Sequence, residues 1–183
     1  KHVRVTYSTL SSPDPLLHEY YEEDVVAVKA GFGETFPMYI NGEWVTAEDT
    51  FTSISPVDTS LIVGRFQQAG PEDVAAAMRA ARVAFPAWRE TPWQERNALL
   101  IKVADLISER MFMLGAVISI EVGKNRLESI GEVEEAADLI RHCVTAMHEN
   151  NGFCRPLASE DSNTRNHSVL KPYGVWGVIS PFN

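Results

Sequence analysis

KPYGVWGVISPFN, residues 171–183, is the stretch that decides the fold of this 183-residue chain. Its centre, Val175 to Ile179, is a continuous apolar run, which is typical of a strand buried on both faces of a parallel sheet. Ligands bind such sheets at the carboxyl ends of strands, and Ser180-Pro181-Phe182-Asn183 follows at that end. The stretch therefore predicts an α/β fold, with a strand over residues 173–180 and a ligand site directly after it.

Upstream of that strand, the sequence first predicts a helix and short strand pairs. The helix is expected from Pro15 to about Gly31. Asn41-Gly42 between two β-prone runs is the strongest hairpin signal, because both turn residues must tolerate positive φ. A second strand pair is expected over residues 51–55 and 61–67, on either side of a turn-rich joint.

Four helices are expected next. The first starts at Gly70-Pro71, and Pro86 should kink it or end its last turn. Thr91-Pro92-Trp93-Gln94 reads as a capping box that opens the second helix. The third should follow Arg110 and run to Val122, where Gly123 stops it, and the fourth should run from about Arg126 to Glu149.

Apolar residues at helical spacing mark the expected core faces. Cys143 lies beside the face of the fourth helix, so we expect it to be a small core residue. Residues 155–167 are polar and loop-like, and a strand is expected from Ser168 to Tyr173. The faces of the first, second and fourth helices comprise Val74, Ala77, Met78, Ala81, Phe85 and Trp88; Leu99, Val103, Leu106 and Ile107; and Leu127, Ile130, Val133, Ala137, Ile140, Val144 and Met147.

Composition excludes several classes of function. With 16 Lys and Arg against 25 Asp and Glu, the net charge is -9, which disfavours a nucleic-acid partner. No apolar run approaches the roughly 18 residues of a membrane span, and no secretory signal opens the chain. The two cysteines lack metal-ligand spacing, so no metal site is expected. With so few cysteines, a cytoplasmic location is expected. Because the chain begins with Lys1 and stops just after a buried strand, we interpret it as the N-terminal part of a longer protein.

Four segments stand in order along the chain: Tyr39 to Trp44; Ser55 to Asp58 followed by Val63-Gly64; Glu121 to Asn125; and Lys171 to Asn183. In these segments and in their order, the sequence from about Pro37 to Asn183 resembles the N-terminal third of the aldehyde dehydrogenase superfamily. The Glu-Val-Gly-Lys-Asn string and the acidic helix after it are most similar to the 1-pyrroline-5-carboxylate (glutamate γ-semialdehyde) dehydrogenase branch. The Ile-Ser-Pro-Phe-Asn ending also occurs in aromatic-aldehyde members.

This resemblance implies a division of the chain. Residues 1–36 would form an N-terminal helical extension, and residues 37–158 the hairpins and helices of the NAD(P)-binding domain. Residues 159–172 would be a hairpin strand that pairs across subunits of a homo-oligomer. Residues 173–183 would be the first strand and loop of a Rossmann-like sheet, cut short.

The resemblance also implies roles for single residues. The side-chain amide of Asn183 would donate a hydrogen bond to the oxyanion formed when a cysteine thiolate attacks the aldehyde. Taken alone, an asparagine is more often a loop or helix cap, and it is the preceding Ile-Ser-Pro-Phe that favours the oxyanion role for Asn183. Ile179, Ser180, Pro181 and Phe182 would line the dinucleotide, although plain strand packing explains Ile179 as well.

Two glutamates and the two cysteines are interpreted separately. Glu135 would lie near the substrate tunnel, but helical spacing places it on a polar face, where a solvated charge is the simpler expectation. Glu121 matches a carboxylate that holds a monovalent cation in some relatives. The matching nucleophilic cysteine and general-base glutamate would follow Asn183 by a long stretch, so neither Cys143 nor Cys154 is expected to be the nucleophile.

The function implied is NAD- or NADP-dependent oxidation of a small-molecule aldehyde to a carboxylate. The reaction would run through thiolate attack, hydride transfer and hydrolysis of an acyl-enzyme. The rival interpretation is a non-catalytic interaction or scaffold module that kept the helical layer. Neither the aldehyde nor the choice between NAD and NADP is encoded in the residues present.

Overall fold

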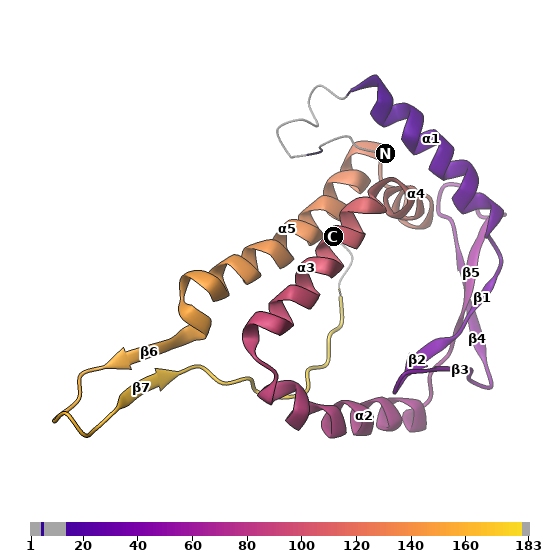
Figure 1. Ribbon diagram of the computed structural model, residues 1–183. Helices are drawn as coiled ribbons and strands as arrows, with labels where there is room; N and C mark the ends of the chain where they lie inside the picture. Colours follow the sequence, from indigo (N-terminus) through magenta and orange to yellow (C-terminus); the bar gives the residue numbers. More distant parts are fainter. Residues whose placement is uncertain (1–4, 6–13, 181–183) are drawn as a thin grey trace.

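The computed structural model describes residue 5 and residues 14–180 (Figure 1). Helices dominate, and every sheet is small. In this part of the chain, no helix is long and apolar enough to cross a membrane. The elements are α1 (Pro15–Ala30), β1 (Thr35–Phe36), β2 (Met38–Ile40), β3 (Glu43–Val45), β4 (Thr50–Ile54), β5 (Ile62–Gln67), α2 (Pro71–Glu90), α3 (Trp93–Glu109), α4 (Met111–Val122), α5 (Arg126–Glu149), η1 (Asn151–Phe153), β6 (Cys154–Leu157) and β7 (Asn166–Val169).

The strands form three separate sheets. β5 lies between β1, to which it is parallel, and β4, to which it is antiparallel. The predicted hairpin is confirmed as β2 and β3, and its turn residues Asn41 and Gly42 both have positive φ, 55° and 83°. β6 and β7 form a second antiparallel hairpin after α5. The α/β class expected from the sequence is therefore confirmed.

The core lies where α1, α4 and α5 meet. Phe112 is 2% exposed and Ile130 is fully buried, and Tyr20 of α1 packs edge-on against the Phe112 ring at 5.7 Å. Arg126, the first residue of α5, ties α1 to this core by pairing with Glu22 and lying 4.4 Å from the centre of the Tyr21 ring. The buried cluster comprises Val5, Leu17, Tyr21, Met111, Phe112, Ala116, Ile130 and Val133.

Local capping explains why α4 ends and α5 begins where the sequence predicts. Gly123 ends α4 in the left-handed conformation, with φ of 79°, which a glycine adopts without steric cost. Asn125 then caps α5, because its side-chain oxygen accepts the Glu128 backbone N–H at 3.0 Å. The buried positions Ile130, Val133, Ala137 and Val144 confirm much of the predicted core face of α5.

The junction between α2 and α3 differs from the prediction. Pro86 does not end α2, which continues to Glu90. No residue of α2 is buried, so water can satisfy the carbonyl group that a proline leaves unpaired. The capping box is also wrong: Pro92 occupies the N-cap of α3, and the Thr91 hydroxyl donates to the Ala87 carbonyl at 3.0 Å. Thr91 therefore closes α2 and does not open α3.

The predicted core face of α3 is wrong for three of its four residues, whereas the fourth, Ile107, is partly buried against the core. Leu99, Val103 and Leu106 are 48%, 45% and 47% exposed, whereas Asn97 and Ala104 are the residues that α3 buries. Asn97 lies against α5, where its side-chain amide donates to the Val144 carbonyl at 3.5 Å. Periodicity identifies an apolar face, but it does not say which element covers that face.

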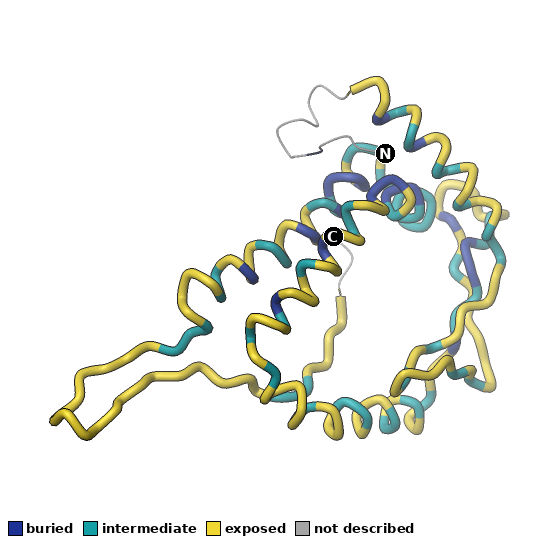
Figure 2. Tube along the Cα trace, viewed as in Figure 1, coloured by how far each residue is buried: buried dark blue, intermediate teal, exposed yellow. Residues whose placement is uncertain are grey.

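The apolar face of α2 is likewise uncovered. Val74, Met78 and Trp88 are all exposed. In Figure 2 the tube of α2 has only the colours of exposed and intermediate residues. Cys143 is exposed too, so the expectation of a core cysteine is wrong. It precedes the buried Val144, and one residue turns the side chain by about 100° around a helix, away from α3.

Two corrections concern the end of the described chain. Residues 154–157, expected within a loop, form β6 and pair with β7 from Cys154–Val169 to Leu157–Asn166. Conversely, residues 170–180 have no regular secondary structure, although a strand is predicted over 173–180. A strand needs partners for its backbone N–H and C=O groups, and none of the described strands pairs with this segment. Most of its apolar residues, Leu170, Tyr173, Trp176, Val178 and Ile179, are therefore exposed.

Candidate functional site

The first candidate region is the C-terminal segment, residues 173–180. Ile179 is 95% exposed, Ser180 is exposed, and Tyr173 contacts Trp176 edge-on at 6.0 Å between ring centres. Within this segment Gly174 has a positive φ of 119°. Pro181, Phe182 and Asn183, the other predicted site residues, lie outside the described residues.

This segment exposes apolar and hydrogen-bonding groups of the kind that border one side of a bound ligand. Ile179 and Ser180 expose an apolar side chain, a hydroxyl group and peptide groups that no described strand uses. Such residues fit one side of a dinucleotide, which needs an apolar surface and backbone hydrogen-bonding groups. The chain contains no G-x-G-x-x-G phosphate loop, so the described residues would supply part of such a site only.

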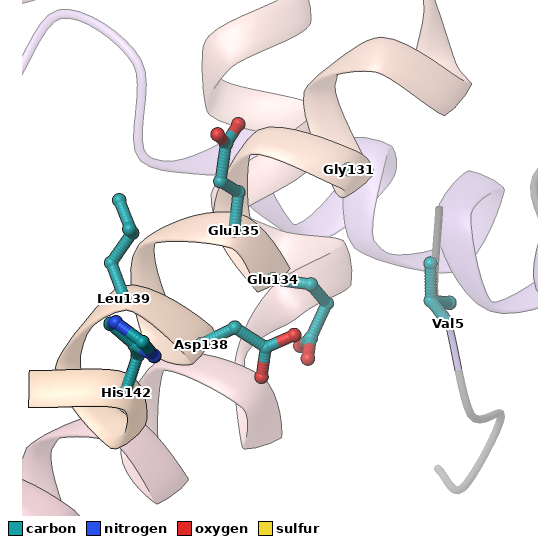
Figure 3. Close-up of a pocket in the computed structure, with 7 residues that line it drawn as sticks. All are labelled: Val5, Gly131, Glu134, Glu135, Asp138, Leu139 and His142. Carbon is teal, nitrogen blue, oxygen red and sulfur yellow. The ribbon is translucent and has the colours of Figure 1, made fainter. Parts of the chain in front are cut away.

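The second candidate region is a pocket of about 290 Å³ beside α5, and it contains the predicted residue Glu135 (Figure 3). Glu135 is exposed, as its polar-face spacing predicts. In Figure 3 its carboxylate points away from those of Glu134 and Asp138, which lie to one side of the helix. The pocket is lined by Val5, Gly131, Glu134, Glu135, Asp138, Leu139 and His142.

Glu134 is the most unusual of the pocket carboxylates. One carboxylate oxygen accepts the Ser108 hydroxyl at 3.1 Å, whereas Oε1 is buried and has no hydrogen-bond partner among the described residues. Burial raises the pKa of Glu134, and the Ser108 hydrogen bond and the Arg141 charge offset this only in part. The uncharged form of Glu134 is therefore favoured more than it would be in a fully solvated glutamate.

Arg141 organises the polar contacts between α3 and α5. Its guanidinium donates to the carboxylates of Asp105 and Asp138, each at 3.1 Å, and to the Ser108 hydroxyl at 3.0 Å. This network links Glu134 to α3 through Ser108. This network was not predicted from the sequence, although Glu134, Asp138 and Arg141 stand at the i, i+4, i+7 spacing of one helix face.

Glu121 does not stand alone either. It accepts the Ser53 hydroxyl at 3.3 Å, and the neighbouring Ile120 carbonyl accepts the Ser55 hydroxyl at 2.6 Å. These two bonds join the end of α4 to β4 and the turn after it. In the described part of the chain, no group of His, Cys, Asp and Glu side chains has the geometry of a metal site.

Known proteins resemble both the sequence and this arrangement of helices. The chain is 31% identical over 165 residues to the 1-pyrroline-5-carboxylate dehydrogenase of Staphylococcus epidermidis, covering 90% of the chain and 32% of the relative. It is 35% identical over 147 residues to the alpha-ketoglutarate semialdehyde dehydrogenase of Haloferax volcanii, covering 79% of the chain and 30% of the relative. Thus it spans about a third of the length of these curated relatives.

A solved structure agrees with the sequence match. The crystal structure of 1-pyrroline-5-carboxylate dehydrogenase from Thermus with bound NAD superimposes with a TM-score of 0.74 and 32% identity. The match covers 81% of this chain and 28% of the Thermus chain. The profile of the aldehyde dehydrogenase family, in turn, matches residues 44–183, which is most of the sequence. The chain therefore belongs to the aldehyde dehydrogenase family.

Proposed function

We propose that this chain is the N-terminal portion of an NAD- or NADP-dependent aldehyde dehydrogenase. The observation that carries the proposal is the match of residues 44–183 to the family, together with relatives that are three times longer. The substrate class we favour is a semialdehyde that carries a carboxylate, with glutamate γ-semialdehyde first. The names of the two curated relatives support this class over aromatic aldehydes.

The residues of this chain would contribute three things to that reaction. Ile179 to Phe182 would form an apolar wall and offer backbone groups beside the dinucleotide, which supplies a hydride acceptor when bound. Asn183 would donate its side-chain amide to the oxygen of the aldehyde as that oxygen gains negative charge. Glu135 would face the substrate, where its exposed carboxylate could pair with an ammonium group such as that of glutamate γ-semialdehyde.

The hairpin after α5 would serve assembly. β6 and β7 have every residue but Cys154 exposed, and each has one edge without a partner strand in the described chain. A two-stranded hairpin is marginally stable alone, so a strand from a second copy would complete it. The arrangement supports a homo-oligomer in which this hairpin pairs across subunits.

Activity measurements on the full-length protein and on residues 1–183 test the proposal. The full-length protein should reduce NAD or NADP with glutamate γ-semialdehyde and should turn over benzaldehyde far more slowly. Residues 1–183 alone should be inactive with either aldehyde, because the proposed nucleophile and general base follow Asn183. Dehydrogenase activity of residues 1–183 alone would contradict the proposed division of roles. An inactive full-length protein would favour the scaffold interpretation.

A further inference from the structure

The turn that joins α5 to the β6–β7 hairpin has an unusual backbone. Asn151, Gly152 and Phe153 all have positive φ, at 48°, 67° and 55°. Asparagine and glycine visit this left-handed region readily, but a phenylalanine does so rarely. Three such residues in succession need support from their surroundings to persist.

That support comes from the start of α3. The Trp93 indole lies so close to Gly152 that a Cβ there would stand 2.6 Å from the indole Cδ1 atom. His148, in the last turn of α5, packs edge-on against the same indole at 4.9 Å between ring centres. Gly152 is therefore required twice, because its φ is positive and because the indole fills the space of a side chain.

Hydrogen bonds connect this turn to both of its neighbours. The Asn150 side-chain amide donates to the Ala146 carbonyl at 2.8 Å, and the Phe153 N–H donates to the Asn150 carbonyl at 2.9 Å. The Phe153 carbonyl in turn accepts the Leu170 N–H at 3.2 Å, which closes the base of the hairpin. Residues 150–153 are thus bonded both to the end of α5 and to the base of the hairpin, so they set the direction of the hairpin relative to α5.

The hairpin depends on its base for orientation. We call it the arm, residues 154–169. In Figure 1 the arm projects beyond the end of α5 and away from the other helices, and Figure 2 shows it exposed along almost its whole length. Since it does not lie against the helices, its direction is determined where it leaves α5.

We propose that Trp93 and Gly152 form a pivot that fixes the direction in which the arm leaves α5, and that this direction determines how the arm meets a second copy of the chain. The second half of this statement rests on the proposed function, because it takes the arm as the assembly element. Trp93 and Gly152 are positioning residues, and neither needs to touch the second copy.

Arm orientation is measured first, in the full-length protein. Spin-labelled non-canonical amino acids are introduced at two exposed positions, in place of Cys143 on α5 and of Ser162 near the tip of the arm. Double electron–electron resonance then measures the distance between the two labels. The wild-type distance distribution should be narrow. Gly152→Ala and Trp93→Ala should broaden or shift it, while Trp93→Phe, which keeps a ring against Gly152, should restore the narrow distribution.

Two matched controls separate the pivot from general damage. Gly42→Ala also introduces a side chain at positive φ, 83°, but in the β2–β3 turn, where the nearest atom to the new Cβ would be 4.0 Å away. Trp44→Ala removes an indole that is 72% exposed on β3. Both controls should leave the label separation unchanged. Helix content by circular dichroism confirms that each variant is folded.

A double-mutant cycle tests whether the two pivot residues act together. If the indole fills the space beside Gly152, removing it leaves room for a methyl group. The effect of Gly152→Ala on the label separation should then be smaller in a Trp93→Ala background than in wild type. Strictly additive effects would overturn the pairing of these residues.

Self-association is measured second, by sedimentation velocity across a concentration series. Gly152→Ala and Trp93→Ala should raise the dissociation constant of the oligomer by about tenfold or more, and the controls should not. An unchanged label separation in both pivot variants overturns the inference. If the separation broadens as expected but the wild type remains monomeric at every concentration, the pivot is upheld and the assembly role of the arm fails.

Discussion

The helices of this chain divide into two regions with opposite surfaces. α1, α4 and α5 bury their apolar faces against one another, and Phe112 and Ile130 at their centre are at most 2% exposed. α2, α3 and residues 170–180 leave large apolar side chains exposed, among them Leu106 at 47% and Ile179 at 95%. The first region contains its own packing partners. The second has the surface of a region that is covered by something else.

The exposed apolar faces of α2, α3 and residues 170–180 indicate where the remaining two thirds of the proposed enzyme would pack. Exposed apolar faces of this extent are costly in water, and a soluble protein covers them or self-associates through them. The candidate cofactor wall, Ile179 and Ser180, lies in the same uncovered region. Substitutions in the two regions should therefore behave differently in residues 1–183 and in the full-length protein.

The largest effect is expected from the self-contained core. Phe112→Ala should lower the free energy of unfolding by about 3–5 kcal/mol, because it removes a buried ring that packs against Tyr20 and leaves a cavity. The loss should be similar in residues 1–183 and in the full-length protein. Urea denaturation followed by circular dichroism at low protein concentration measures it.

Leu106→Ala is the matched substitution on the uncovered face of α3. In residues 1–183 it should change the free energy of unfolding by less than about 1 kcal/mol, because the side chain is already half in water. In the full-length protein it should cost about 2–5 kcal/mol if the missing part covers this face. A small cost in both proteins would mean that the face remains open.

The next effect concerns catalysis. In the full-length protein, Asn183→Ala should lower kcat by about 10²–10³ while the affinity for the dinucleotide hardly changes. The reason is that an oxyanion donor acts only when the carbonyl oxygen gains charge. Asn163→Ala in the arm is the control, since its backbone N–H, and not its side chain, bonds Asp161 at 2.8 Å. Full turnover in the Asn183 variant would leave loop capping as the role of this residue.

Local features of the fold could be predicted from the sequence, whereas contacts between helices could not. The end of α4 and the start of α5 are predictable, because Gly123, Asn125 and the apolar spacing are all local signals. The buried face of α3 is not, because the choice of Ala104 over Leu106 depends on how α5 lies against it. The contact of Trp93 with Gly152 was also missed, since no sequence pattern connects two residues so far apart in the chain.

In the candidate site, too, features set by helical spacing were predicted and features set by packing between helices were not. Glu135 is on the exposed side of its helix, as its spacing predicts. The buried oxygen of Glu134 and its link through Ser108 to Arg141 escaped prediction, because they arise only when α3 and α5 pack together. The strand predicted over residues 173–180 failed for a related reason: an apolar run identifies a buried strand but cannot supply the neighbours that bury it.

The smallest expected effect is a pH dependence at Glu134. Burial raises the pKa of this carboxyl in the folded state above its value in the unfolded chain. The folded protein therefore binds the proton more tightly, and the stability that this group contributes is complete below the unfolded pKa and is lost as pH rises through the folded pKa. Glu134→Gln cannot ionise, so it should keep that contribution at neutral pH.

Glu134→Gln should thus match wild type near pH 4 and become the more stable protein toward pH 7. The gain should stay below about 1 kcal/mol, because the side chain is only partly removed from water. The glutamine oxygen can still accept the Ser108 hydroxyl, so the variant changes the charge more than the packing. Urea denaturation at fixed ionic strength from pH 4 to pH 8 measures the difference, with Glu135→Gln on the exposed side of α5 as the control for losing one charge. A difference that stays constant with pH would mean that the burial of the Glu134 oxygen carries no proton linkage.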